Sequence, residues 1–128
     1  MKFAIDTNAY VAFCKADPKI VKYFQEAQQI FIPYIVLAEL RAGFFCGNQE
    51  SKNERNLVAF LNSERVQVLY TDEDTTFHYA RIFSQLKLSG QPIPTNDLWI
   101  ASLLVQNNLY FLTLDAHFDL LPQLLLLK

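Results

Sequence analysis

The chain has 128 residues, enough for a domain with its own core, and we expect a single domain over residues 1–128. Hydrophobic residues make up 52% of the chain and only 3 positions are glycine, which excludes a disordered or fibrous protein. The formal net charge of -2 lacks the basic excess of many nucleic-acid-binding proteins. Binding to a nucleic acid would therefore have to depend on a local site.

The cysteine content and the apolar runs indicate in which cellular compartment the protein functions. Two cysteines, Cys14 and Cys46, are too few for a disulfide framework, and we interpret both as reduced, small packing residues. The first residues do not form a signal-peptide pattern, because Asp6 interrupts the apolar run. No run approaches the roughly 20 apolar residues of a membrane span. These features predict a cytoplasmic protein with no membrane partner.

Short apolar runs alternate with amphipathic segments along the chain. They predict strands over residues 2–5, 30–32, 66–70, 110–113 and, as a short fifth strand, 124–127. Helices are expected over residues 10–15, 18–27, 34–45, 56–61, 73–88 and from 97 onward, with a polar loop over 47–53. Alternating strands and helices predict an α/β sandwich on a mostly parallel sheet of four to five strands.

The helix over residues 73–88 also carries an expectation about its buried face. The apolar positions at helical spacing are Phe77, Ala80 and Phe83, followed by Leu86 or Leu88. We predict that this stripe packs against the rest of the domain.

Four acidic residues occupy positions that this fold would bring together. Asp6 directly follows the first strand, and Asp115 follows the fourth. Asp97 lies in the first turn of a helix, after a loop with two prolines, and Glu39 interrupts an otherwise apolar helix. Because ligands of open parallel sheets bind at the carboxyl ends of the strands, we predict that these carboxylates meet at one edge.

Each acid also has an ordinary structural explanation. Asp6 would suit a turn, Asp97 is favoured by the helix dipole, Asp115 would cap a short turn, and Glu39 would pair with a distant Lys or Arg. Grouped carboxylates repel one another unless a cation compensates, and oxygen ligands suit Mg²⁺ or Mn²⁺. A zinc cluster of His and Cys is not expected, since the sequence pattern places His117 alone.

Several short motifs carry a resemblance to a known family. They are Ile5-Asp6-Thr7-Asn8, Glu39 in an early helix, Pro94-Thr95-Asn96-Asp97-Leu98-Trp99-Ile100-Ala101, and Leu112-Thr113-Leu114-Asp115-Ala116-His117-Phe118. In this order, over residues 3 to about 118, the chain resembles the PIN-domain family, and most closely the VapC-type toxins of bacterial toxin–antitoxin pairs. One departure is Leu114, where relatives often carry a polar or basic residue.

The resemblance implies a PIN-like three-layer α/β/α sandwich and a Mg²⁺- or Mn²⁺-dependent endoribonuclease. It implies that the catalytic and metal-binding quartet is Asp6, Glu39, Asp97 and Asp115. It further implies an RNA substrate, a cognate antitoxin protein and a toxin homodimer. Because the family includes members without detected nuclease activity, a catalytically silent PIN domain that binds RNA or protein remains the alternative.

Further residues are candidates for supporting roles. Thr7, Asn8 and Thr113 would orient the acids or the phosphate, unless they only complete strand-end turns. Candidate RNA contacts, which could equally be solvated helix residues or core in the case of the Trp, are Arg41, Lys52, Arg55, Lys87 and Trp99. His117 is a weaker candidate for a proton donor. A hydrophobic groove for the antitoxin would come from a subset of Tyr10, Phe13, Tyr23, Phe24, Phe44 and Phe45.

Two other classes of protein begin with an acid after the first strand. Phosphatases with an aspartyl nucleophile need a second Asp two positions later, where this chain has Asn8. A phosphorylated receiver module needs paired acids at the first strand, and Asp6 has no adjacent acid, although Asp72 and Asp74 follow the third strand. Both classes fit the sequence less well than the nuclease.

Overall fold

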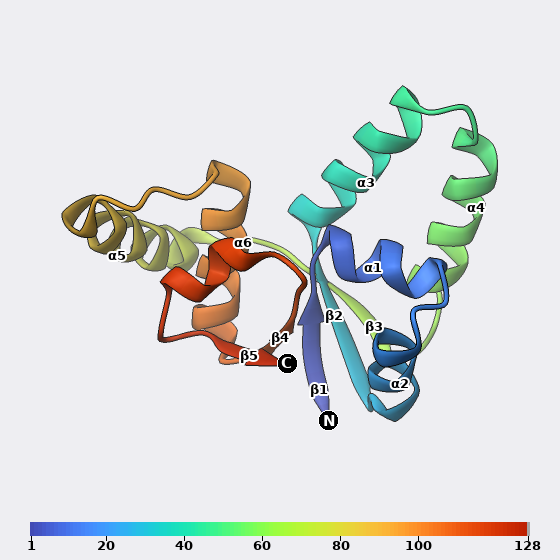
Figure 1. Ribbon diagram of the computed structural model, residues 1–128, viewed down its shortest axis with the longest axis horizontal. Helices are drawn as coiled ribbons and strands as arrows, with labels where there is room; N and C mark the ends of the chain where they lie inside the picture. The colour runs from blue at the N-terminus through green and yellow to red at the C-terminus, as the bar shows by residue number, and fades with distance from the viewer. Residues whose placement is uncertain (128) are drawn as a thin grey trace.

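A computed structural model describes residues 1–127 of the chain. Within them lies a five-stranded sheet with the order β3-β2-β1-β4-β5, in which all neighbouring strands are parallel (Figure 1). The strands are β1 (Lys2–Ile5), β2 (Gln29–Pro33), β3 (Val66–Leu69), β4 (Tyr110–Leu112) and β5 (Leu125–Leu127). The predicted parallel α/β fold is confirmed.

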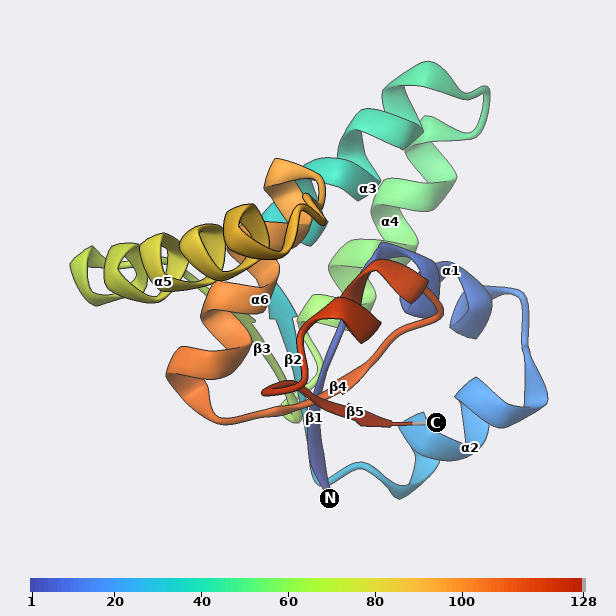
Figure 2. The same ribbon diagram turned by 60° about the vertical axis from the view of Figure 1, so that its left-hand side comes forward.

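Helices cover both sides of the sheet. They are α1 (Thr7–Cys14), α2 (Pro18–Glu26), α3 (Tyr34–Cys46), α4 (Glu50–Leu61), α5 (Glu73–Ser89) and α6 (Thr95–Asn107), with a 3-10 helix, η1, over Ala116–Leu120. In Figure 1, α1, α2 and α4 lie to the right of the strands, and α5 and α6 lie to the left. Figure 2, turned by 60°, shows α3 and α4 as a hairpin that projects beyond the sheet.

The residues of the central strand, β1, are buried on both faces of the sheet. Phe3, Ala4 and Ile5 of β1 are all 0% exposed, and so are Ile30 and Ile32 of the neighbouring β2. Strands covered by helices on both faces have continuous apolar runs instead of alternating ones. The core therefore lies on either side of β1, and after the exposed Lys2 the next polar side chain is that of Asp6, where the strand ends.

The strand order creates a topological switch point beside Asp6. From β1 the chain builds outward through β2 and β3, and then returns to add β4 and β5 on the opposite side of β1. The connections after β1 and β4 therefore leave in opposite directions at the carboxyl edge. In open parallel sheets, ligands bind at such a switch point.

Local capping residues determine where several helices begin and end. Asp17 accepts hydrogen bonds from the backbone N–H groups of Lys19 and Ile20, and Pro18 occupies the first position of α2. Asp72 and Thr75 form a capping box at the start of α5. Gly90 ends α5 with a φ of 69°, a left-handed conformation that glycine adopts without strain.

Two details of the predicted helices are wrong. The polar loop over 47–53 is shorter than expected, because α4 begins at Glu50. The expected apolar face of α5 points outward, with Phe77 66%, Phe83 50% and Leu88 87% exposed. Of the expected face only Leu86 is buried, and α5 packs on α6 through a stripe that also includes the buried Thr75 and Ile82. The aromatic positions fit helical spacing, but spacing alone does not say which side meets the partner helix.

Cys14 and Cys46 are free and exposed, so their interpretation as packing residues is wrong. Among residues 1–127, no helix has both the length and the apolar character that a membrane crossing requires.

Candidate active site

Asp6 lies at the carboxyl end of β1 and begins α1. Its Oδ1 accepts a hydrogen bond of 2.8 Å from the backbone N–H of Ala9, as an N-cap residue does. Its Oδ2 accepts a hydrogen bond from the hydroxyl of Thr113, which follows β4. Only 5% of Asp6 is exposed, so both carboxylate oxygens are oriented by the surrounding fold.

The environment of Asp6 opposes its ionisation. Burial raises the pKa of this carboxyl from 3.8 to about 6, against the hydrogen bonds from Thr113 and Ala9. The negative charges of Asp115 and Asp97 raise the pKa further. Three of the four predicted acids therefore lie close enough to interact electrostatically.

Glu39 extends from α3 toward the same edge. Its Oε1 accepts a hydrogen bond of 2.9 Å from the hydroxyl of Thr7, the first residue of α1. The charge of Glu39 contributes to raising the pKa of Asp97, after burial and repulsion by Asp115. Glu39 thus belongs to the same cluster, and Thr7 holds it there.

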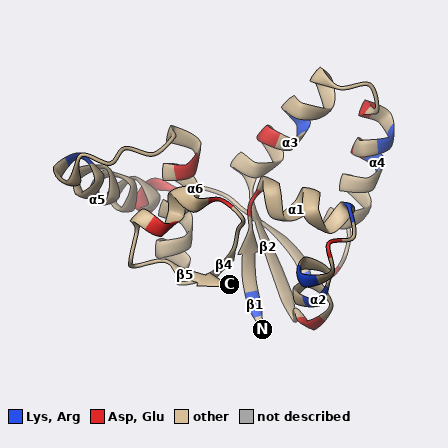
Figure 3. Ribbon diagram, viewed as in Figure 1, with Lys and Arg blue, Asp and Glu red and all other residues tan. Residues whose placement is uncertain are grey.

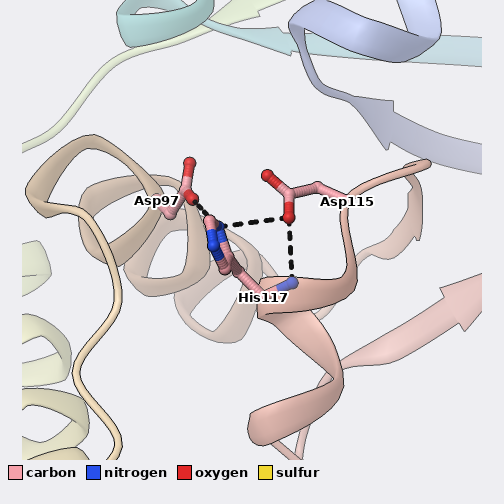
Figure 4. A group of neighbouring side chains, drawn as sticks. All are labelled: Asp97, Asp115 and His117. Atoms are coloured by element: carbon pink, nitrogen blue, oxygen red, sulfur yellow. Dashed lines mark hydrogen bonds and ion pairs between the residues drawn. The ribbon is translucent and has the colours of Figure 1, made fainter.

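Asp97 and Asp115 meet around a histidine (Figure 4). His117 Nδ1 lies 3.0 Å from Asp97 Oδ2 and 3.1 Å from Asp115 Oδ1. The backbone N–H of His117 also donates to Asp115 Oδ1 at 2.9 Å. The hydrogen bond with Asp97, together with the charge of Asp115, raises the pKa of His117 above 6.5. His117 therefore has two acidic neighbours, although no second His or Cys joins this group among the described residues.

The sequence did contain a signal for His117. It lies two positions after Asp115, so the short turn that follows β4 carries both side chains. Sequence reasoning missed the pairing because Asp97, the other neighbour of His117, is 20 positions away on α6.

A divalent cation fits this cluster. Among residues 1–127, no Lys or Arg forms an ion pair with Asp6, Glu39, Asp97 or Asp115. In Figure 3, acidic positions (red) lie at the end of β1, after β4, on α3 and on α6. One ligand atom each from Asp97, Asp115 and His117 lies within 4.8 Å of the others. Mutual repulsion with no Lys or Arg partner is the situation that a bound cation relieves.

Thr113 connects two of the acids. Besides donating to Asp6, its hydroxyl accepts a hydrogen bond of 3.0 Å from the backbone N–H of Asp115. Thr7 similarly supports Glu39, whereas Asn8 is exposed at the start of α1. Thr7 and Thr113 therefore orient acids of the cluster directly.

The other candidate contacts lie in different environments. Arg41 donates two hydrogen bonds to Glu54, of 3.0 and 2.9 Å, which join α3 to α4. Lys52 and Arg55 are exposed on α4, and Lys87 is exposed near the end of α5. Trp99 is half-buried against Tyr79, with ring centroids 4.3 Å apart, so part of its surface serves packing.

The fold and the site together define a class of protein: an α/β/α domain with clustered carboxylates at the switch point of a parallel sheet. Residues 3–124 match the PIN domain family. "Ribonuclease VapC1" of Haemophilus influenzae (strain R2866) is 34% identical over 117 residues, covering 88% of this chain and 86% of that protein. The chain therefore belongs to the PIN domain family and, within it, to the VapC proteins.

Solved structures agree with this assignment. VapBC-1 from nontypeable Haemophilus influenzae matches with a TM-score of 0.87 at 29% identity, covering 100% of this chain and 98% of that chain. VapBC2 from Rickettsia felis, bound to a DNA fragment from the promoter, matches with a TM-score of 0.86 at 28% identity, covering 99% and 98%. The resemblance seen in the sequence motifs is confirmed.

Proposed function

We propose that this chain is a metal-dependent endoribonuclease and the toxin of a toxin–antitoxin pair. The likeness to proteins named ribonuclease VapC, and to structures named VapBC, supports the activity and the partner. The observation that carries the proposal is the convergence of Asp6, Glu39, Asp97 and Asp115 in one electrostatically coupled cluster. Within residues 1–127, the cluster has no Lys or Arg counter-charge.

The proposed reaction is hydrolysis of an RNA phosphodiester. A bound Mg²⁺ or Mn²⁺ would offset charge on the phosphate and lower the pKa of water at the site. Asp6, Glu39, Asp97 and Asp115 would hold the ion, because their oxygens are hard ligands at the edge of the sheet. The negative charges that repel one another in the free protein would then be compensated.

Hydrogen bonds from neighbouring polar groups orient these carboxylates. Thr113 and the backbone N–H of Ala9 each engage one oxygen of Asp6, and Thr7 engages Glu39. The backbone N–H of His117 engages Asp115. Such hydrogen bonds limit rotation of the acids, which lowers the entropy cost when an ion or a phosphate binds.

RNA also needs positive charge outside the acidic centre, because contacts to phosphates dominate its affinity. We assign this role first to Lys52 and Arg55, whose side chains are exposed on α4. Lys87 is a further candidate on α5. Arg41 has less charge to offer, since Glu54 engages its guanidinium with two hydrogen bonds.

The antitoxin would bind an apolar pocket between α1, α3 and α4. The pocket has a volume of about 310 Å³, and its lining includes Tyr10, Val11, Cys14 and Phe44. Phe45 nearby on α3 is 73% exposed. An amphipathic antitoxin segment could cover this apolar surface. Of the aromatic residues singled out in the sequence, Phe24 and Tyr10 are buried in the core, although Tyr10 also lines this pocket.

A homodimer and a cytoplasmic location complete the proposal. The exposed Phe77, Phe83 and Leu88 make α5 unusually apolar for a helix that faces solvent, which favours a second copy as its cover. The cytoplasm is where cellular RNA and a newly made antitoxin would both meet the toxin. The dimer would be tested by light scattering of the wild type beside Phe83→Glu.

The decisive experiment is cleavage of total cellular RNA by the purified, antitoxin-free protein, with Mg²⁺, with Mn²⁺ and with EDTA. Asp6→Asn and Asp97→Asn should abolish cleavage, whereas Asp74→Asn, an exposed acid in the first turn of α5, should retain it. Cleavage that persists in EDTA, or in both site variants, would refute the assignment. If the wild type binds metal and RNA but cuts nothing, the chain is a silent binding module.

A further inference from the structure

His117 lies within the acidic cluster, at a position from which it could bind a metal ion together with the carboxylates. Its Nδ1 faces Asp97 Oδ2 at 3.0 Å and Asp115 Oδ1 at 3.1 Å, and Figure 4 shows the ring between the two carboxylates. These three side chains are also the group whose ligand atoms lie within 4.8 Å of one another. We propose that His117 donates Nδ1 to the divalent ion held by Asp97 and Asp115, so that this site prefers Mn²⁺ to Mg²⁺.

The two separations match the spacing of neighbouring ligands around one ion. Ligands about 2.1 Å from an octahedral ion lie about 3.0 Å apart when they occupy adjacent corners. The separations of 3.0 and 3.1 Å between Nδ1 and the two oxygens therefore need little rearrangement to accept an ion. An ordinary ion pair has the same spacing, so a measurement must separate the two roles.

The surroundings hold the ring in place without burying it. Phe118, the next residue, is 1% exposed and packs edge-on against Phe111, with ring centroids 4.8 Å apart. The backbone N–H of His117 is itself bound to Asp115. The side chain of His117 remains 51% exposed, so its contribution to core packing is small. An anchored backbone with an accessible ring is the arrangement expected of a ligand.

The choice of metal follows from the chemistry of the imidazole. Mg²⁺ binds oxygen almost exclusively and retains its water, whereas a nitrogen ligand favours divalent transition metals. A nitrogen added to a carboxylate cluster therefore shifts its preference from Mg²⁺ toward Mn²⁺. This inference rests on the proposed metal-dependent site and adds a ligand to it.

The test is electron spin-echo spectroscopy of Mn²⁺ added to the metal-free, antitoxin-free protein, because this method detects a directly bound nitrogen. The chain has 2 His, and His78 on α5 supplies the matched control. Wild type and His78→Gln should show nitrogen coupling, and His117→Gln should not. His117→Gln should also weaken Mn²⁺ binding by roughly tenfold or more, while Mg²⁺ binding, measured by competition, changes much less.

Two results would overturn the inference. If wild type binds Mn²⁺ without nitrogen coupling, or His117→Gln keeps the Mn²⁺-to-Mg²⁺ ratio of the wild type, His117 is only an ion-pair partner. The nuclease proposal would survive either result, provided that the metal-dependent RNA cleavage is seen. If wild type binds no Mn²⁺ at all, the inference about His117 fails, and the nuclease proposal fails with it only if Mg²⁺ neither binds nor supports RNA cleavage. Circular dichroism of His117→Gln would verify that the exposed substitution leaves the fold intact.

Discussion

The hydroxyl of Thr113 donates a hydrogen bond to Asp6 Oδ2, although the two residues are 107 positions apart in the chain. The same hydroxyl accepts from the backbone N–H of Asp115. One small side chain at the end of β4 thereby ties together the acids that follow β1 and β4. The pairing of β1 with β4 is what makes this bridge possible.

Replacing Thr113 should therefore impair the site more than the fold. Thr113→Val keeps the shape but removes the hydroxyl, which leaves Asp6 without one of its two orienting donors. We expect RNA cleavage to fall by roughly tenfold or more, as for other residues that orient metal ligands. Thr113→Ser, which retains the hydroxyl, is the control and should stay close to wild type. Equal activity of the Val and Ser variants would show that the bridge is dispensable.

The buried Asp6 makes the metal-free protein less stable as the pH rises. Its pKa of about 6 in the folded state exceeds the value of 3.8 in the free side chain, so the folded state retains a proton that the unfolded chain has released. This stabilisation is complete below about pH 4 and disappears as the pH rises through 6. The raised pKa values of Asp97 and His117 act in the same direction.

Urea unfolding in EDTA between pH 4.5 and 7.5 would measure this dependence. The contribution of Asp6 should amount to roughly 2–3 kcal/mol across its full titration, at about 1.4 kcal/mol for each pKa unit. Asp6→Asn should flatten the profile and be more stable than wild type at pH 7.5, because a neutral amide replaces a buried charge. Identical slopes for the two proteins would contradict the prediction.

A divalent ion should reverse that destabilisation. Binding to the folded state alone stabilises it by about 2.7 kcal/mol when the free ion is at a hundred times its dissociation constant. Thermal unfolding at pH 7.5 with and without Mn²⁺ should therefore show a clear rise in Tm for the wild type. Asp97→Asn should lose most of this rise, and Asp74→Asn should keep it. An equal rise in all three proteins would place the ion elsewhere.

Exposed basic residues on α4 should govern RNA affinity. In an Asp97→Asn background, which prevents cleavage, Lys52→Ala combined with Arg55→Ala should weaken RNA binding. The slope of log affinity against log salt should become shallower by about 0.7 for each RNA phosphate that the variant no longer neutralises. Arg41→Ala should change the slope less, because Glu54 already pairs with Arg41. A larger effect of Arg41→Ala would reverse this assignment.

Sequence pattern was sufficient to predict the architecture. The apolar runs at residues 2–5 and 110–113 are short, lack alternation and end in polar residues, which is typical of buried parallel strands. Asp6 and Asp115 follow these runs, so their meeting at one edge could be predicted without coordinates. Strong local signals, such as Asp17-Pro18 before α2, also placed helix starts correctly.

Sequence pattern was insufficient where two faces of an element are both plausible. On α5 the aromatic stripe with Phe77 and Phe83 looked like the buried one, yet the helix contacts α6 through Ile82 and Leu86. Polarity at residues 50–53 suggested a loop, but an exposed first turn of a helix is polar as well. Local composition shows which residues are hydrophobic, but it does not show on which side of the helix the neighbouring element will pack.

The sequence by itself determined which side chains could bind a cation and which strand ends would carry them, since strand periodicity and residue chemistry are local properties. Only the tertiary structure decided which groups touch. It set Thr113 against Asp6, Thr7 against Glu39, and His117 between Asp97 and Asp115. Those contacts arise from strand order and from the packing of α3 and α6 at the switch point. Apart from the contact between His117 and Asp115, they join residues 20 or more positions apart in the chain, whose distances no local pattern encodes.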